Sequence, residues 1–186
     1  MPYNPDKQHR RSIRLKDYDY TQGGAYFVTI CTGQREYLFG EIHTGMMRCN
    51  IYGEIAAEEW QCTPQLRACV ELDVFVVMPN HIHGIILITR DIVVGAQRAA
   101  PLQTPHLLQG VTANNVTSGS LGAIVRAFKS AVTKRINEMR DTPAAPIWQR
   151  NYYEHVIRSE DSCNYIRHYV ATNPERWEED SLYIPP

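Results

Sequence analysis

Two histidines separated by one residue, His81 and His83, are the first residues whose types and spacing suggest chemistry. They follow a Pro79-Asn80 pair and open an apolar, β-branched run, HIHGIILIT. Because side chains alternate between the faces of a strand, both imidazoles should point to one face, about 7 Å apart at the backbone. Neutral imidazole nitrogens bind divalent metals and leave most of the cation's charge available to polarise a phosphate. The pair therefore predicts a metal site, although two histidines on a half-exposed strand can also be merely solvated.

A third ligand and a nucleophile would have to come from another element. Near the C-terminus, Tyr169 and Asn173 are spaced by four residues, and Tyr165 precedes them by another four. On a helix this spacing puts a phenol and an amide on the same face, one turn apart. The alternative is that these tyrosines are half-buried core aromatics. Tyr152 and Tyr153 are rival nucleophiles, disfavoured because neither has a potential ligand one turn away.

The elements expected to position these residues alternate between strands and helices. The patterns of apolar residues and turn signals predict a strand at 25–32, a small hairpin around His43-Thr44-Gly45, a helix from Ile51 to about Cys62 ended by Pro64, strands at 71–78 and 81–89, a helix at 121–140, a strand within 147–159, and a helix capped by Ser159 and ended by Pro174.

This order predicts an α+β protein with a ferredoxin-like βαββαβ antiparallel sheet, helices on one face, and an additional C-terminal helix that carries the tyrosine. The other face of the sheet is expected to be free for a ligand. We expect a basic arm at residues 1–20 and one domain at 21–186, interrupted by a long loop at about 91–120 that is rich in Gly, Pro, Thr, Asn and Gln.

Composition limits the classes of function. The chain has 186 residues, 44% of them hydrophobic, and a formal net charge of −1, so a nucleic-acid partner would need a local basic patch. The five cysteines include no Cys-x-x-Cys pair, which argues against a thiolate zinc site or a disulfide framework. No signal peptide or membrane span is visible. We expect a cytoplasmic protein without a membrane partner.

Basic residues gather in two places. The predicted helix at 121–140 has a polar face that includes Arg126, Lys129 and Arg140, opposite its apolar stripe. The predicted arm contains Arg10, Arg11, Arg14 and Lys16. Both groups are candidates for phosphate contacts, and the alternative is an ordinary solvated helix face with a disordered tail.

Two motifs carry a family resemblance. MPNHIHG resembles the His-hydrophobic-His (HUH) motif of single-tyrosine transposases, and YVATNP resembles the Tyr-aliphatic-x-x-Asn-Pro motif of their relatives, the REP-associated tyrosine transposases. The segments RRSIRLKDYDY, AYFVTICT, LFGEI, LGAIVRAFKS and YEHVIRS are also similar to members of that group, so the resemblance spans almost the whole chain. The long loop before Leu121 departs from the compact pattern of the group.

The resemblance implies roles for the candidate residues. His81 and His83 would hold a divalent ion, Tyr169 would be the nucleophile, and Asn173 would complete the coordination. It also implies Mg²⁺ or Mn²⁺ as the cofactor and single-stranded DNA next to hairpins, such as REP-like elements, as the substrate. The activity would be nicking and strand transfer through a 5′-phosphotyrosine intermediate.

Other functions stay open at this point. The protein could be a non-catalytic regulator that binds hairpin nucleic acid on the same fold, or an unrelated hydrolase or structural metal protein that uses the two histidines. Both a monomer and a homodimer are compatible with the sequence.

Overall fold

The computed structural model describes residues 22–89 and 119–185 of the chain. The predicted basic arm and nearly all of the predicted long loop lie outside these residues. None of the helices in the described part is both long and apolar enough to cross a membrane.

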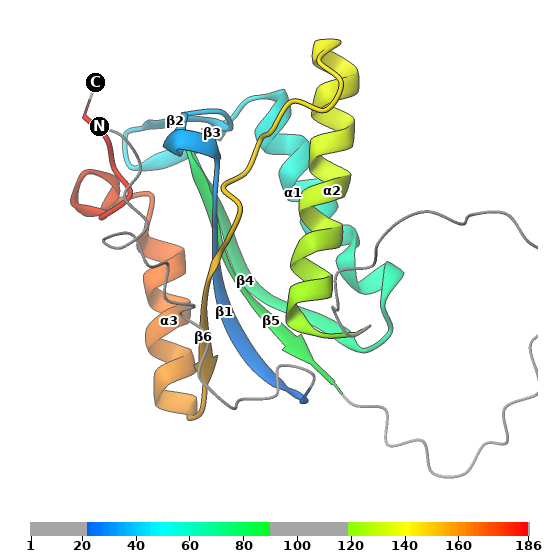
Figure 1. The fold of residues 1–186 in the computed structure, drawn as a ribbon. Coiled ribbons are helices and arrows are strands. Elements are labelled where there is room, and N and C mark those ends of the chain that lie inside the picture. The colour runs from blue at the N-terminus through cyan, green and yellow to red at the C-terminus, as the bar shows by residue number, and fades with distance from the viewer. Residues whose placement is uncertain (1–21, 90–118, 186) are drawn as a thin grey trace, which may run out of the picture.

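A four-stranded antiparallel sheet forms the centre of the fold (Figure 1). Its strands, in the spatial order β4-β5-β1-β6, are β1 (Gly24–Cys31), β4 (Val70–Met78), β5 (His81–Ile88) and β6 (Tyr153–Ile157). A separate two-stranded sheet pairs β2 (Gly40–His43) with β3 (Met46–Cys49). The ferredoxin-like α+β fold predicted from the order of elements is thereby confirmed, as is the small hairpin.

Helices cover both faces of the central sheet (Figure 1). Helices α1 (Ile51–Leu66) and α2 (Leu121–Arg140) pack against each other on one face, and α3 (Glu160–Thr172) lies on the other. Two short 3-10 helices, η1 (Gly33–Arg35) and η2 (Trp177–Glu179), complete the described elements. The face that was expected to be free for a ligand is therefore partly occupied by α3 and the segment that follows it.

The helix ends follow from local chemistry. Ser120 and Ser159 cap α2 and α3 because each side chain accepts a backbone N–H of the first turn. Asn50 caps α1 in the same way. Helix α1 corrects one prediction, since it continues through Pro64 to Leu66. Proline removes one donor, but it lies in the last turn, where its carbonyl still accepts a hydrogen bond from the Arg67 N–H.

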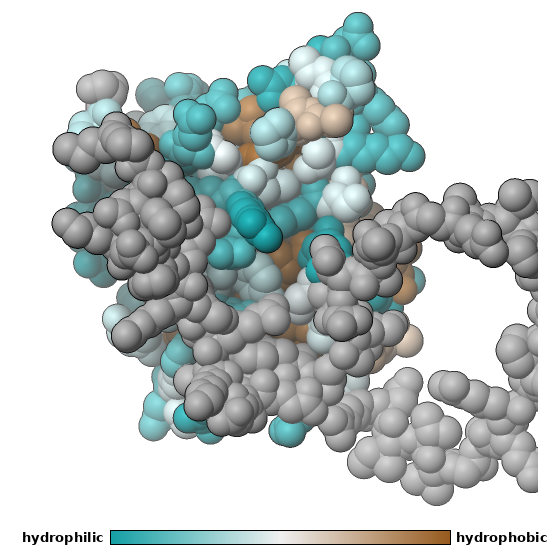
Figure 2. Space-filling view, in the orientation of Figure 1, coloured by the Kyte–Doolittle hydropathy of each residue, from teal (hydrophilic) through white to brown (hydrophobic). Residues whose placement is uncertain are grey.

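Two hydrophobic clusters stabilise the two layers. The larger cluster lies between the sheet and α1 and α2, and includes Val28, Ile82, Trp60 and Phe128. The smaller cluster, Phe27, Ile85, Cys163, Ile166 and Val170, holds α3 against the opposite face. On the face that Figure 2 shows, the visible described residues are largely hydrophilic, with a few hydrophobic patches among them. The predicted histidine pair, Tyr169 and Asn173 lie on the α3-covered face of the sheet.

Candidate active site

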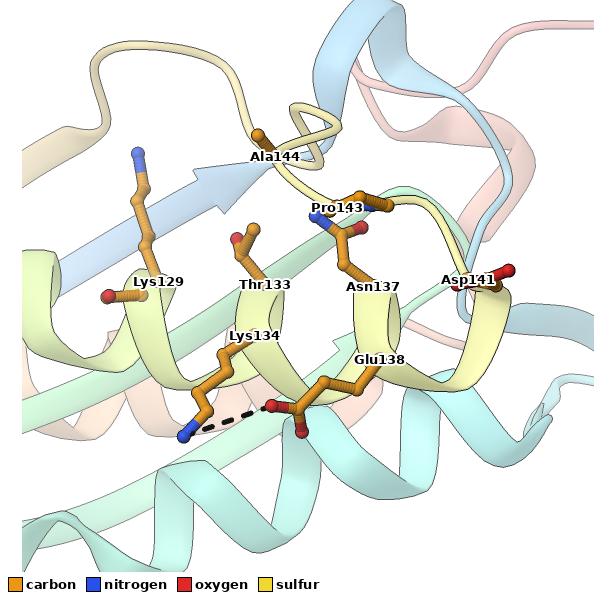
Figure 3. Close-up of a pocket in the computed structure, with 9 residues that line it drawn as sticks. Lys129, Thr133, Lys134, Asn137, Glu138, Asp141, Pro143 and Ala144 are labelled. Atoms are coloured by element: carbon orange, nitrogen blue, oxygen red, sulfur yellow. Dashed lines mark ion pairs between the residues drawn. The ribbon is translucent and has the colours of Figure 1, made fainter.

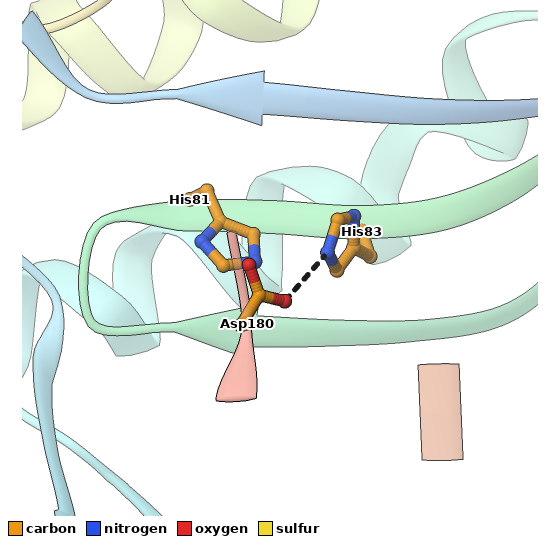
Figure 4. A group of neighbouring side chains, drawn as sticks. All are labelled: His81, His83 and Asp180. Carbon is orange, nitrogen blue, oxygen red and sulfur yellow. Dashed lines mark ion pairs between the residues drawn. The ribbon is translucent and has the colours of Figure 1, made fainter. Parts of the chain in front are cut away.

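His81 and His83 lie side by side at the start of β5, directly after the Pro79-Asn80 turn (Figure 4). Their ring centroids are 4.3 Å apart. Both point to the α3 face, whereas Ile82 between them points into the larger cluster. The histidines are 0% and 3% exposed, so the alternative of a merely solvated pair does not hold. A buried imidazole needs partners for both of its nitrogens.

Each imidazole has a partner for its Nδ1 atom. The Nδ1 of His81 lies 2.8 Å from the side-chain oxygen of Asn80, whose amide group donates to the backbone oxygens of Arg35 and Leu182. The Nδ1 of His83 lies 2.8 Å from the hydroxyl of Thr29. An oxygen partner that accepts from Nδ1 leaves the lone pair on Nε2, which is the tautomer that a metal-binding histidine requires.

Asp180 faces the two Nε2 atoms from the segment after η2 (Figure 4). One ligand atom from each of His81, His83 and Asp180 lies within 4.8 Å of the others, and the Asp180 carboxylate is 3.9 Å from His83 Nε2. Among the described residues, no hydrogen-bond partner reaches His81 Nε2. Two imidazole nitrogens and one carboxylate are a common donor set for a divalent cation, so the residues present fit a metal ion.

The Tyr169 hydroxyl adjoins this cluster. It lies 3.2 Å from His83 Nε2 and donates a hydrogen bond of 3.2 Å to Asp180. The tyrosine ring also packs edge-on against Phe27, whose own ring stacks on His83. Helix α3 therefore brings the phenol of Tyr169 to the histidines, which is the arrangement that the predicted nucleophile needs.

Charges in the cluster are controlled by burial. Burial lowers the pKa of both His81 and His83, which favours neutral imidazoles at pH 7. For Asp180, burial acts to raise the pKa, but interactions with His83 and Asn173 outweigh it and the pKa falls below its usual range. The pKa of Tyr169 is raised, first by burial and then by the Asp180 charge. Without a cation, the site therefore combines neutral imidazoles, a carboxylate and a protonated phenol.

Asn173 follows the last residue of α3 and is buried. Its amide group donates a hydrogen bond of 2.7 Å to Asp180, so the predicted amide and the carboxylate are neighbours. Its Oδ1 atom has no hydrogen-bond partner within the part of the chain that the structure describes. Asn173 thus orients Asp180 and retains an oxygen with ligand capacity.

Asp180 was not among the residues singled out from the sequence. It sits in a short acidic run, Glu178-Glu179-Asp180, which on its own is typical of a solvated surface. Its side chain is nevertheless only 2% exposed, because the backbone N–H of Leu182 and the Asn173 amide both bind it. Only the path of the chain after α3 brings this carboxylate to the histidines.

The basic residues of α2 lie on the other side of the sheet from the histidines (Figure 1). Arg126 is exposed, and the Arg140 guanidinium lies over the ring of Tyr52. The Lys129 ammonium donates to the backbone oxygens of Gln149 and Asn151. The structure therefore does not bring these three residues to the candidate active site. Arg10, Arg11, Arg14 and Lys16 lie outside the described residues.

A groove of about 750 Å³ runs along α2 beside the loop that follows it (Figure 3). Lys129, Thr133 and Asn137 line it from the helix, and Pro143 and Ala144 line it from the loop. It contains none of the residues of the histidine cluster. The concave feature on α2 and the candidate active site are therefore different places on the molecule.

The fold of this chain occurs in a solved structure. The chain shares its fold with the solved structure of a REP-associated tyrosine transposase bound to a REP hairpin, with a TM-score of 0.58 and 17% sequence identity, over 90% of this chain and 74% of that one. The fold that the family resemblance implies is thereby confirmed.

A relative in sequence is an uncharacterised protein of Haemophilus influenzae, 41% identical over 182 residues, which span 98% of this chain and 97% of that protein. The chain belongs to the same protein family as this Haemophilus influenzae protein. A search with models of established protein families finds no match to the sequence.

Proposed function

We propose that the protein is a metal-dependent, single-stranded DNA nickase and strand transferase of the single-tyrosine transposase type. One observation carries the proposal: the Tyr169 hydroxyl lies 3.2 Å from His83 Nε2 in a buried cluster of two histidines and one aspartate. This combination occurs on a fold that a REP-associated tyrosine transposase uses. By analogy with the hairpin bound to that protein, the proposed substrate is single-stranded DNA beside a hairpin.

His81, His83 and Asp180 are the proposed ligands of the divalent cation, with Asn173 Oδ1 as an additional oxygen ligand. Mg²⁺ and Mn²⁺ are the proposed ions. When bound there, the cation would polarise a phosphate oxygen and favour the ionised form of the neighbouring phenol. Such help is needed because burial and the Asp180 charge both hold the pKa of Tyr169 above its ordinary value.

Tyr169 is the proposed nucleophile. Its oxygen would attack the phosphorus in line, forming the tyrosyl phosphodiester and breaking the bond to the 3′ oxygen of the preceding nucleotide. The phenolic proton would pass to solvent as the phenol ionises, and the departing 3′ oxygen would take up a proton from solvent as it becomes a hydroxyl. Since the tyrosyl ester conserves the phosphodiester bond, attack by a 3′-hydroxyl on this ester reverses the reaction and joins strands.

The test is covalent capture of DNA. A labelled oligonucleotide with a hairpin and single-stranded flanks is incubated with the protein and Mn²⁺, and the products are separated on a denaturing gel. We expect a protein-linked band for the wild type and for Tyr165→Phe, a matched change one turn away, but none for Tyr169→Phe. An adduct that persists in Tyr169→Phe would refute the nucleophile assignment.

A second candidate function is hairpin binding without cleavage, as a regulator. The burial of His81 and the hydrogen bond that holds the Tyr169 phenol in its protonated form favour it. In this case the wild type binds the hairpin but forms no adduct with Mn²⁺ or Mg²⁺. The same gel, combined with a binding measurement, separates the two functions.

We further propose that the exposed cations of α2, Arg126 and Arg140, contact phosphates of the hairpin away from the cleaved bond. The arm residues Arg10, Arg11, Arg14 and Lys16 are proposed for the same role. Lys129 is a weaker candidate because its ammonium already binds two backbone oxygens.

A further inference from the structure

Two exposed tyrosines flank the candidate active site and have no role in the proposed reaction. Tyr165 on α3 is 74% exposed and Tyr153 on β6 is 47% exposed. A single exposed ring is ordinary on a protein surface, but two that lie beside the same candidate site offer flat apolar surfaces to a ligand bound there. Each belongs to a regular element that fixes the position of its backbone.

Tyr153 is joined to the site by the register of the sheet. Thr29 pairs with His83 on one side and with Tyr153 on the other, so the three side chains form one row across the α3 face. The Tyr153 ring also makes an edge contact with Phe27, with 6.3 Å between ring centroids, and Phe27 stacks on His83. Tyr153 therefore continues the floor of the site to β6, the edge strand of the sheet.

Tyr165 flanks the nucleophile on the helix. It precedes Tyr169 by four residues, which places the two side chains on the same face of α3, one turn apart. An exposed cation lies nearby: the pKa of Arg176 is raised mainly by its ion pair with Glu179 and, more weakly, by Tyr165 and Tyr169. A guanidinium near an exposed ring matches a nucleotide, which has an aromatic base and a phosphate.

We infer that Tyr153 and Tyr165 are stacking platforms for unpaired bases on the two sides of the cleaved phosphate. The inference rests on the proposed function. It identifies the nucleotides beside the cleaved phosphate as the part of the DNA that must be unpaired to bind. Paired bases are stacked on their neighbours and cannot lie on these rings, whereas an unpaired base can. Stacking on a protein aromatic accepts any base, so the two rings would select for single-strandedness more than for sequence.

The test measures DNA binding in EDTA, where no cleavage occurs. The probes are a hairpin with single-stranded flanks and the same hairpin without flanks. Fluorescence anisotropy of the labelled probe measures the binding. For the flanked probe, Tyr153→Ala and Tyr165→Ala should each raise Kd by about 5- to 140-fold, the range for loss of one stacked base. The conservative changes Tyr153→Phe and Tyr165→Phe should stay within about twofold of the wild type, since they keep the ring.

Two controls sharpen the result. Leu66→Ala removes a side chain of similar exposure, 77%, from the end of α1 on the other face of the sheet, and should leave Kd unchanged. An abasic site at the stacked position should weaken DNA binding by the wild type. The same abasic site should not weaken binding by the matching alanine variant any further, because that variant has already lost the ring. This comparison identifies the base that each ring contacts.

Three outcomes would overturn the inference: alanine variants that bind the flanked probe like the wild type, phenylalanine variants as weak as the alanine variants, or equal losses for both probes. Sedimentation of wild type and Tyr165→Ala adds a fourth, since a dimer that dissociates in the variant would make this ring a subunit contact. Failure of the proposed function looks different. In that case the wild type forms no adduct with Mn²⁺, whatever the binding data show.

Discussion

At the scale of single residues, the site is defined by how its buried polar atoms are satisfied. Asn80 and Thr29 engage the Nδ1 atoms of the histidines, and Asn173 and Leu182 bind the Asp180 carboxylate. Two buried atoms of the site, His81 Nε2 and Asn173 Oδ1, have no hydrogen-bond partner among the described residues. A buried polar atom without a partner costs about 1–3 kcal/mol, and a cation bound between these atoms would remove that cost.

The metal assignment predicts a ligand-dependent gain in stability. We expect Mn²⁺ at about 100 times its Kd to stabilise the wild type by about 2.7 kcal/mol, and to stabilise His83→Ala and Asp180→Asn little or not at all. Thermal unfolding with and without Mn²⁺ measures this difference within each variant, so the intrinsic cost of each substitution cancels. An equal rise in Tm for His83→Ala and the wild type would exclude this residue as a ligand.

The lowered pKa of Lys129, which lies outside the candidate active site, predicts that the free energy of unfolding depends on pH. Burial lowers the pKa of its ammonium from 10.5 to about 8. Between these two pH values the unfolded chain binds more protons than the folded one, so the free energy of unfolding should rise with pH in this window. Urea denaturation of wild type and Lys129→Met from pH 8 to 10.5 tests it, and the wild type should gain stability relative to the variant. A constant difference across the window would contradict the buried, lowered-pKa ammonium.

At the scale of elements, α3 must be held at a fixed height on the sheet for Tyr169 to reach His83. Its apolar face packs on Phe27 and Ile85 through Ile166 and Val170. Its Arg167 forms an ion pair with Asp73 of β4, with nitrogen–oxygen distances of 2.7 and 2.8 Å. The hydrophobic contacts supply most of the attachment, because Arg167 is partly exposed and its ion pair is screened by solvent. Both guanidinium nitrogens contact the same carboxylate oxygen, Asp73 Oδ2, and this contact adds position more than stability.

Gly84, the residue after His83 on β5, lets Trp60 pack directly against the strand because it has no side chain. An added Cβ would overlap the Trp60 ring and approach the Phe75 Cβ to 3.1 Å. We expect Gly84→Ala to lower the free energy of unfolding by about 1–3 kcal/mol, measured by denaturant titration. Gly33→Ala is the matched control, because its nearest neighbour, the Ile147 oxygen, lies at 3.6 Å. A neutral Gly84→Ala would show that Trp60 can move away at little cost.

At the scale of the whole molecule, the two layers on either side of the sheet expose different kinds of residue. The α3 layer contains the candidate active site and the exposed tyrosines, and the α1 and α2 layer presents Arg126 and Arg140. The chain as a whole has a net charge of −1, so attraction to DNA must come from local groups of cations, and Arg126 and Arg140 are two candidates among the described residues.

This arrangement predicts a salt-dependent affinity for hairpin DNA. The logarithm of the binding constant should fall linearly with the logarithm of the salt concentration, and Arg126→Gln or Arg140→Gln should each reduce the slope by about one. Lys134→Gln is the control on the same helix, since Lys134 pairs with Glu138. Titrations at several salt concentrations give the slopes. Unchanged slopes for both arginine variants would place the phosphate contacts elsewhere.

The sequence by itself determined the parts of the molecule that depend on local periodicity. Alternation along a strand put both histidines on one face of that strand, and helical spacing put Tyr169 and Asn173 on one face of a helix. Ser159 marked where α3 begins. The order of these elements was sufficient to predict the sheet, because a ferredoxin-like fold is one of few ways to bury their apolar faces.

Only the tertiary structure decided which distant residues meet. Asp180 joins the histidines because the chain turns back after α3, and no spacing rule relates it to residues 81 and 83. The same holds for the separation of the α2 cations from the site and for the placement of Tyr153 beside Phe27. Contacts of this kind arise from packing of whole elements, whose free energy is distributed over many side chains and leaves no local pattern to read.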